Sequence, residues 1–162
     1  MERQRRLISM PVISEILFLD DVNLALAATT KQAAIEEVLG KLNGDPRVTD
    51  WEALRTAVLK RDAPSIAVNG MGICIAHGRL NSVKSLVLAA GRASTGLACS
   101  EIAEPLRLVF VAGIPAAFDS EYLRVVGAIV RICRDRHQLE RLLAAREADY
   151  FVELLDAGEA KL

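Results

Sequence analysis

The stretch of sequence that decides the fold is Asn69-Gly70-Met71-Gly72-Ile73-Cys74-Ile75-Ala76-His77-Gly78-Arg79. Its central residues, Ile73-Cys74-Ile75, form a short apolar run bounded by glycines, and such a run is typical of a strand in a buried sheet. Similar runs occur on both sides of it, at Ile66, at Leu86-Val87-Leu88 and from Leu106 to Val111. The middle of the chain is therefore predicted to form a buried β-sheet.

Helical patterns precede this apolar middle part. Two pairs of residues have the spacing of a capping box, namely Thr29 with Gln32 and Thr49 with Glu52. Each pair is followed by apolar residues at helical spacing, so each predicts the start of a helix, and the second helix is expected to end near Lys60. Earlier in the chain, apolar and polar residues alternate over residues 22–26, which predicts a short strand.

Helical patterns also follow the apolar middle part. One helix is predicted to begin at Asp119 or Ser120, Asp135 can cap a second, and apolar residues from Tyr150 to Leu155 anchor a third. Helix, sheet and helix in these proportions predict the α/β class. We expect a single-domain layered sandwich in which helices flank a central mixed β-sheet.

Composition excludes several classes of function. The 162 residues include 20 basic and 21 acidic ones, so the formal net charge of −1 gives no electrostatic reason to expect a nucleic-acid partner. No segment approaches the roughly 20 consecutive apolar residues of a membrane-inserted helix. Three widely spaced cysteines suit a reducing compartment, so we expect a cytoplasmic protein. Residues 1–10 are expected to form a basic, flexible extension.

The stretch from residue 69 to residue 79 also carries the chemistry. Gly70, Gly72 and Gly78 permit close backbone approaches, so amide groups are predicted to converge on an anion beside His77. Arg79 adds a permanent cation suited to phosphate oxygens, and a neutral imidazole is a nucleophile near pH 7. These residues suggest capture of a phosphoryl group. Taken alone, they also fit a turn between strands and a histidine packed in the core.

This segment, preceded by Arg61-Asp62, resembles the active-site segment of type-2 EIIA domains of the bacterial phosphoenolpyruvate:sugar phosphotransferase system. That family comprises the fructose/mannitol and the nitrogen-regulatory (PtsN-like) EIIA proteins. The resemblance extends over residues 11–162 and includes three further segments: Thr29-Thr30-Lys31-Gln32, Leu106-Arg107-Leu108-Val109-Phe110 and Leu139 to Leu155. It implies one EIIA domain over that range.

The resemblance also implies a function. His77 would accept a phosphoryl group from the phosphocarrier HPr and relay it to an EIIB domain, or signal its state to a regulatory target. Arg61 matches the family's arginine ahead of this segment, so it would neutralise phosphate charge, with help from Arg79. No metal or cofactor is implied. A free-standing EIIA-like chain resembles the nitrogen-regulatory subgroup more than the fused sugar transporters, so we expect a regulatory role.

Two positions depart from the family pattern. Ala76 stands where the family usually has proline, which removes one fixed φ angle ahead of His77. Tyr122 stands before Leu123 where many members have a second histidine. A tyrosine can donate a hydrogen bond to a phosphate but has no imidazole to protonate near pH 7. Its alternative role is to pack the start of the helix.

Two other functions remain open from the sequence. The first is a signalling module that keeps the fold but binds a partner without accepting a phosphoryl group. The second is a structural zinc site, since Cys74, His77, Cys133 and His137 make a permitted ligand set. Strand geometry opposes the zinc site, because residues three apart on a strand project to opposite faces.

Overall fold

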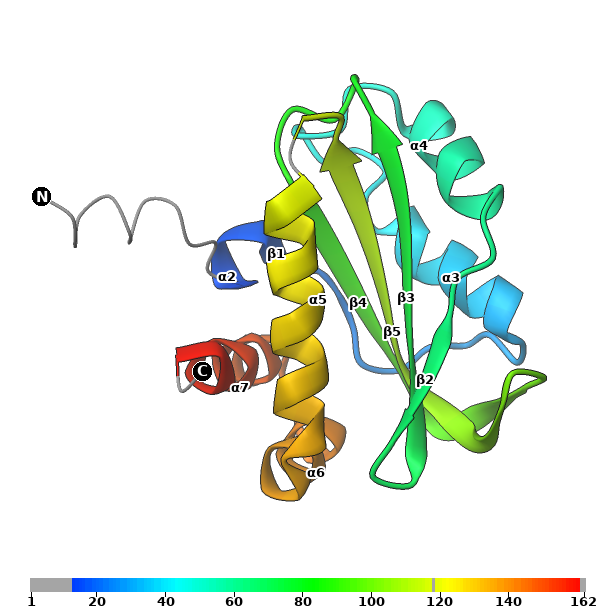
Figure 1. Cartoon of the computed structure of the whole chain (residues 1–162), viewed down its shortest axis with the longest axis vertical. Coiled ribbons are helices and arrows are strands. Elements are labelled where there is room, and N and C mark those ends of the chain that lie inside the picture. Colours follow the sequence, from blue (N-terminus) through cyan, green and yellow to red (C-terminus); the bar gives the residue numbers. More distant parts are fainter. Residues whose placement is uncertain (1–12, 118, 161–162) are drawn as a thin grey trace, which may run out of the picture.

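The computed structural model describes residues 13–117 and 119–160, so the predicted extension over residues 1–10 lies outside it. In the described part a five-stranded sheet has helices on both faces, which confirms the α/β layered sandwich (Figure 1). The strands are β1 (Leu17–Asn23), β2 (Ser65–Val68), β3 (Met71–Leu80), β4 (Val87–Cys99) and β5 (Ile102–Pro115). The helices are α2 (Ile13–Ile16), α3 (Lys31–Gly40), α4 (Trp51–Leu59), α5 (Asp119–Arg134), α6 (Arg136–Ala144) and α7 (Ala148–Ala160).

The sheet is mixed, as predicted. Its strand order is β1-β4-β5-β3-β2. β1 with β4 and β3 with β5 are parallel pairs, whereas β2 with β3 and β4 with β5 are antiparallel. β5 is the central strand, and both of its neighbours are long. The site described below lies on β3, next to this best-protected strand.

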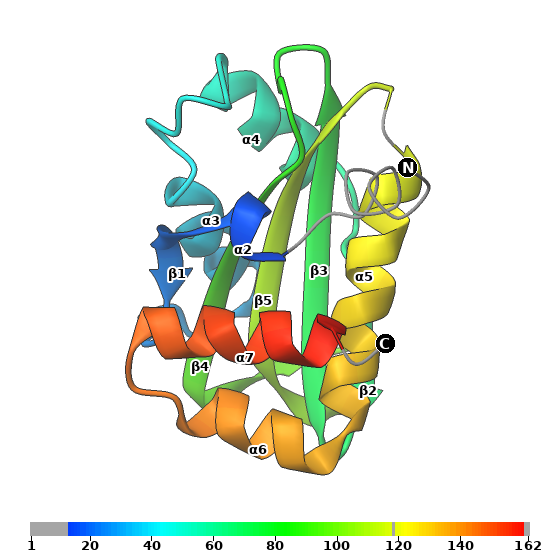
Figure 2. The same ribbon diagram turned by 90° about the vertical axis from the view of Figure 1, so that its left-hand side faces the viewer.

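Helices on the two faces create two separate cores. α3 and α4 cover one face, whereas α5, α6 and α7 cover the other, where α7 runs across the strands (Figures 1 and 2). Strand β3 supplies both cores by alternation, because Ile73 and Ile75 belong to the α5–α7 core while Cys74 and Ala76 belong to the α3–α4 core. None of the helices within residues 13–117 and 119–160 is long and apolar enough to cross a membrane.

The first strand differs from its prediction. A strand was expected over residues 22–26, but β1 ends at Asn23. The carboxylate of Glu37 in α3 accepts hydrogen bonds from the amides of Ala27 and Ala28, and the Asn23 side chain accepts one from Ala25. These bonds draw the chain out of the sheet, because each amide they use is lost to strand pairing.

The predicted helices all exist, but two caps are displaced by one residue. In α4 the cap is Asp50, whose carboxylate accepts a hydrogen bond from the Ala53 amide at 3.1 Å. The predicted cap, Thr49, instead donates its hydroxyl to the Ser82 carbonyl at 2.6 Å. Asp135 caps α6 as predicted.

The same displacement at α3 gives a direct test. Thr30, not Thr29, accepts a hydrogen bond from the amide of Ala33 at 3.1 Å. We expect Thr30→Ala to lower the free energy of unfolding by about 1 kcal/mol. Thermal denaturation should show a Tm lower by about 2–4 °C. Thr29→Ala is the matched control and should leave Tm unchanged; an equal loss in both variants would contradict this cap.

Candidate functional site

The sheet places His77 near the end of β3. In the parallel pair of β3 with β5, His77 lies opposite Ala112. The pairing with β2 on the other side covers only Met71–Cys74, so within the described chain no strand flanks the outer edge of β3 beyond that point. Arg61, which follows α4, lies at this uncovered edge and contacts His77.

Both ring nitrogens of His77 have a side-chain partner. Nη1 of Arg61 lies 3.2 Å from Nε2 of His77, and Oη of Tyr122 lies 3.1 Å from Nδ1. The Tyr122 ring also packs against the imidazole, with ring centroids 4.8 Å apart. His77, Arg61 and Tyr122 therefore meet at one point, although they come from three parts of the chain. The sequence analysis expected Arg61 near His77 and left the role of Tyr122 open.

These contacts assign the tautomer of His77. A guanidinium can only donate hydrogen bonds, so Nε2 must accept from Arg61 with its lone pair. In a neutral imidazole the proton then resides on Nδ1, which donates to Oη of Tyr122. The unprotonated nitrogen thus faces the uncovered edge of β3, where Arg61 lies.

The surroundings also keep the imidazole neutral. Burial lowers the pKa of His77 from its usual value, and the positive charges of Arg61 and Arg79 lower it further. Burial raises the pKa of Tyr122 to about 12, so its phenol stays protonated near pH 7. An uncharged imidazole, which keeps an unprotonated nitrogen, is the form that acts as a nucleophile.

Gly70 and Gly72 were expected to bring amide groups to an anion beside His77, but Met71–Leu80 is one continuous strand. Gly70 lies in the turn that joins β2 and β3, where it has a φ of 81° and Asn69 one of 49°. Gly72 is five residues before His77, which is about 16 Å along a strand at about 3.3 Å per residue. The structure therefore does not bring Gly70 or Gly72 to His77. The Asn69-Gly70 dipeptide, a strong signal for a hairpin, could have revealed this.

Gly78, by contrast, adjoins His77 and has a packing role. A Cβ at Gly78 would lie 3.0 Å from Cγ2 of Val58 and 3.1 Å from the Val58 amide nitrogen. A side chain there would push α4 away from β3. Gly78 therefore allows the close approach of the helix whose end carries Arg61.

The alternative zinc site is wrong. Cys74 belongs to the α3–α4 core and Cys133 to the α5–α7 core, on opposite faces of the sheet. His77 contacts Tyr122 and Arg61, and His137 lies at the start of α6. Among the described residues no group of three or more His, Cys, Asp and Glu side chains is placed to hold a metal ion.

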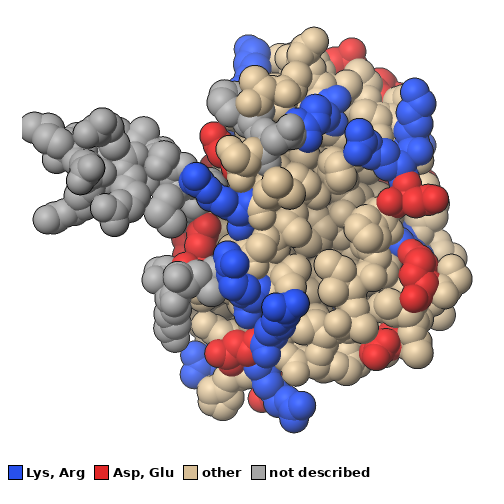
Figure 3. Space-filling model, in the orientation of Figure 1, with Lys and Arg blue, Asp and Glu red and all other residues tan. Residues whose placement is uncertain are grey.

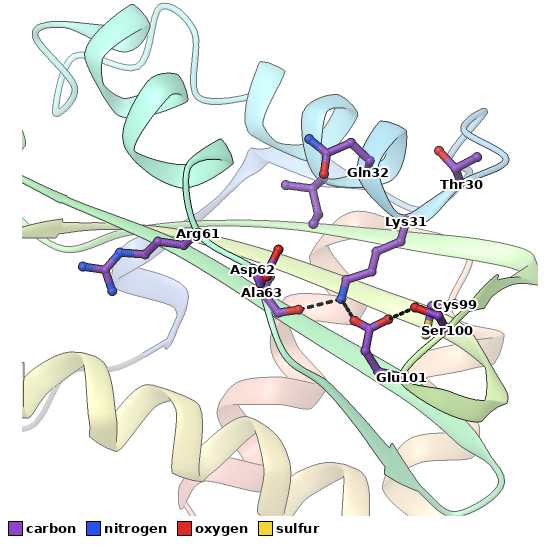
Figure 4. Close-up of a pocket in the computed structure, with 10 residues that line it drawn as sticks. Thr30, Lys31, Gln32, Arg61, Asp62, Ala63, Cys99, Ser100 and Glu101 are labelled. Atoms are coloured by element: carbon purple, nitrogen blue, oxygen red, sulfur yellow. Dashed lines mark hydrogen bonds and ion pairs between the residues drawn. The ribbon is translucent and has the colours of Figure 1, made fainter.

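Arg61 contributes to the lining of two surface cavities. The larger one, of about 510 Å³, has a hydrogen-bonded group at its wall, in which the Lys31 ammonium contacts the Glu101 carboxylate and the Ala63 carbonyl (Figure 4). The Arg61 side chain points away from that group. The smaller cavity, of about 410 Å³, lies beside α4 and includes Arg61 and Arg79 in its lining. Arg61 therefore contacts His77 and also lines both cavities.

Two residues near the site escaped the sequence analysis. Lys60 lines the smaller cavity beside Arg61. The available signal in the sequence was that Lys60 directly precedes Arg61. Leu123, next to Tyr122, is 66% exposed, which is unusual for a large apolar side chain. The sequence could have indicated this exposure, because Leu123 lies outside the apolar stripe of α5.

The comparisons with known proteins show the family of this chain. Residues 15–158 match the family model of the phosphoenolpyruvate-dependent sugar phosphotransferase system, EIIA 2. The chain belongs to this EIIA family. It is similar to a fructose-specific EIIA component from Haloferax volcanii, with 28% identity over 144 residues, covering 88% of this chain and 94% of the relative. A nitrogen regulatory protein from Bradyrhizobium diazoefficiens is 24% identical over 147 residues, with coverages of 88% and 94%.

Solved structures show the same fold. The nitrogen regulatory protein IIA-Ntr from Neisseria meningitidis superposes with a TM-score of 0.70 at 22% identity, covering 88% of this chain and 98% of that one. The mannitol IIA enzyme of Escherichia coli, solved in complex with phosphorylated IIB, gives a TM-score of 0.68 at 21% identity, covering 88% and 99%. The EIIA fold is therefore present in this chain.

The contact between Arg61 and His77 can be tested by titration. In this EIIA chain Arg61→Gln removes a positive charge beside the imidazole, so the pKa of His77 should rise toward its usual value. The measurement is an NMR titration of the His77 ring protons. Arg55→Gln, which removes a guanidinium from neighbouring α4, is the control and should leave that pKa unchanged. An unchanged pKa in Arg61→Gln would contradict the contact.

Proposed function

We propose that His77 accepts a phosphoryl group from phospho-HPr at Nε2 and passes it to an EIIB domain or presents it to a regulatory target. The observation that carries this proposal is the pairing of the Nε2 lone pair with the Arg61 guanidinium at 3.2 Å. A neutral imidazole supplies the nucleophile, and a cation stands ready for the charge that arrives with the phosphoryl group.

The transfer step is an in-line displacement. The Nε2 lone pair forms a bond to phosphorus while the bond from phosphorus to the donor breaks, and the electron pair leaves with the donor. Arg61 must release Nε2 before attack, and it then donates to the equatorial phosphoryl oxygens. Arg79 shares this role. Tyr122 lies in the first turn of α5, so the positive end of that helix dipole is on the same side.

Tyr122 acts as a positioning residue in this mechanism. It accepts a hydrogen bond from Nδ1–H of His77 and so keeps the proton away from the nucleophilic nitrogen. The half-buried ring also packs against the imidazole and restricts its orientation.

A regulatory, nitrogen-type role in the cytoplasm is the more specific form of this proposal. Curated relatives include both a sugar-specific component and a nitrogen regulatory protein. Ala76 and Tyr122 replace residues that the family uses for relay, which favours signalling by the phosphorylation state over rapid onward transfer. The three cysteines, Cys74, Cys99 and Cys133, are free thiols, which supports a reducing compartment.

Phosphoryl transfer can be tested by mass spectrometry. Incubation with phosphoenolpyruvate, Enzyme I and HPr should add one acid-labile phosphoryl group to the wild-type chain. His77→Ala should abolish the adduct because it removes the nucleophile, whereas His137→Ala should retain it. If the wild type stays unmodified while a nitrogen regulatory relative is labelled in parallel, the protein is a partner-binding module without phosphoryl transfer.

The role of Tyr122 predicts a separate effect on rate. Tyr122→Phe removes the partner of Nδ1–H, and the loss of one hydrogen bond should slow phosphorylation by roughly threefold to tenfold. NMR of the ring nitrogens should show a larger share of the Nε2–H tautomer. Tyr122→His should restore an Nδ1 partner and recover the rate. A Phe variant with unchanged rate and tautomer would show that Tyr122 only packs.

A further inference from the structure

We propose that the smaller cavity, beside α4, binds a small organic phosphate whose charged group interacts with Arg61. The cavity has a volume of about 410 Å³, within the range of small-molecule sites. Its lining comes from α4 and from the end of β3 and consists of Ala53, Thr56, Ala57, Lys60, Arg61, Arg79 and Leu80.

The charge of the lining selects an anion. Lys60, Arg61 and Arg79 contribute positive charge, and none of the described residues lining the cavity is Asp or Glu. Two of the cations are arginines, whose forked donors match phosphate oxygens. Figure 3 shows Lys and Arg side chains near the top of this face, on the side where Figure 1 places α4, and a second group lower down over α5.

The uncharged part of the lining favours a phosphate ester over a bare phosphate ion. Ala53, Ala57 and Leu80 give the cavity an apolar wall, which can cover the organic part of a ligand. The Thr56 hydroxyl donates to the Glu52 carbonyl at 3.0 Å, so Oγ1 of Thr56 can still accept a hydrogen bond from the organic part of the ligand. An inorganic ion would leave this wall in water.

The larger cavity does not share this selectivity. Its lining holds Lys31 and Arg61 but also Asp62 and Glu101. Lys31 and Glu101 form an ion pair, and Arg61 points away from it (Figure 4). The charges of that cavity compensate one another, so the cavity beside α4 is the one that attracts an anion.

Arg61 couples the cavity to His77. A ligand phosphate in the cavity and a phosphoryl group on His77 both require the guanidinium that contacts Nε2 in the unmodified protein. Each anion should therefore weaken the binding of the other, and linkage makes the two effects equal. This coupling rests on the proposed function, whereas ligand binding to the unmodified protein does not.

Calorimetry on the full chain tests the cavity without any phosphotransferase partner. The probes are inorganic pyrophosphate, which measures attraction of charge alone, adenosine 5′-monophosphate, which adds an organic part, and adenosine, which lacks charge. We expect both anions to bind with millimolar or tighter affinity, adenosine 5′-monophosphate to shift the NMR signals of the Ala53 and Ala57 methyl groups, and adenosine to bind undetectably. Added salt should weaken the binding.

A matched pair of variants locates the binding. Lys60→Ala should weaken the affinity for adenosine 5′-monophosphate by about twofold to fivefold, the loss expected for one exposed charged contact. Lys41→Ala removes an exposed lysine beyond the end of α3, outside the cavity, and should leave it unchanged. No anion binding at millimolar concentration, or equal binding to the wild type and Lys60→Ala, would overturn the proposal. If Lys60→Ala instead weakens only HPr binding, the cavity receives an acidic side chain of a protein, and the small-ligand proposal fails.

The coupling is measured on protein phosphorylated chemically with phosphoramidate, so that it does not depend on HPr. The phosphorylated chain should bind adenosine 5′-monophosphate more weakly than the unmodified chain, whereas treated and untreated His77→Ala should bind it with equal affinity. Equal affinity in the two wild-type forms would refute the shared use of Arg61. A failure of HPr to phosphorylate the protein would instead refute the proposed function and leave the binding result standing.

Discussion

The parallel pairing of β3 with β5 is the constraint on which the site depends. It continues from Ile73 opposite Leu108 to Leu80 opposite Pro115, and it determines which face each residue of β3 occupies. Because side chains alternate with a period of two, a slip of one residue would turn His77 toward α4 and away from Tyr122. The slip would also place the small Cys74 and Ala76 in the α5–α7 core, where Ile73 and Ile75 now pack, and would force the larger isoleucines into the α3–α4 core. The register of β3 that buries its apolar side chains in both cores is therefore also the register that turns His77 toward Tyr122.

Within that frame Arg61 has two electrostatic effects on His77 that act in opposite directions. Its charge favours the neutral imidazole, which is the nucleophilic form, yet its donor occupies the lone pair that must attack. Magnitudes decide how this conflict ends. A neutral hydrogen-bond acceptor gains about 1 kcal/mol from such a contact, whereas two unit charges about 4 Å apart near a protein surface interact by about 4 kcal/mol. In the proposed transfer the incoming phosphoryl group carries more than one charge, so Arg61 would move from the ring to the phosphate as the donor arrives.

Some of this arrangement could be predicted from the sequence, and the rest depends on contacts between distant residues. The apolar runs predicted β2 to β5, and Asp135 predicted the start of α6, because these signals are local. The caps of α3 and α4 were displaced by one residue because a polar residue stands at both candidate positions, and only the backbone decides between them. The contact of Tyr122 with Nδ1 joins residues 45 apart, and no local pattern encodes such a distance. The glycines were assigned to an anion-binding loop because a hairpin turn and a phosphate loop use the same residue type for the same conformational freedom.

Tyr122 also limits what this site can do. Where many family members carry a second imidazole, this chain has a phenol whose pKa of about 12 leaves it protonated throughout the physiological range. A second imidazole could take up a proton and gain a positive charge beside the phosphate; the phenol can only donate or accept a hydrogen bond. Positive charge at the site comes from Arg61, Arg79, the nearby Lys60 and the helix dipole of α5. Burial and the two arginines lower the pKa of His77, so its neutral form persists into mildly acidic solution. In the proposed transfer to His77, the substitution makes phosphoryl acceptance less sensitive to pH and leaves charge neutralisation to the basic side chains around the ring.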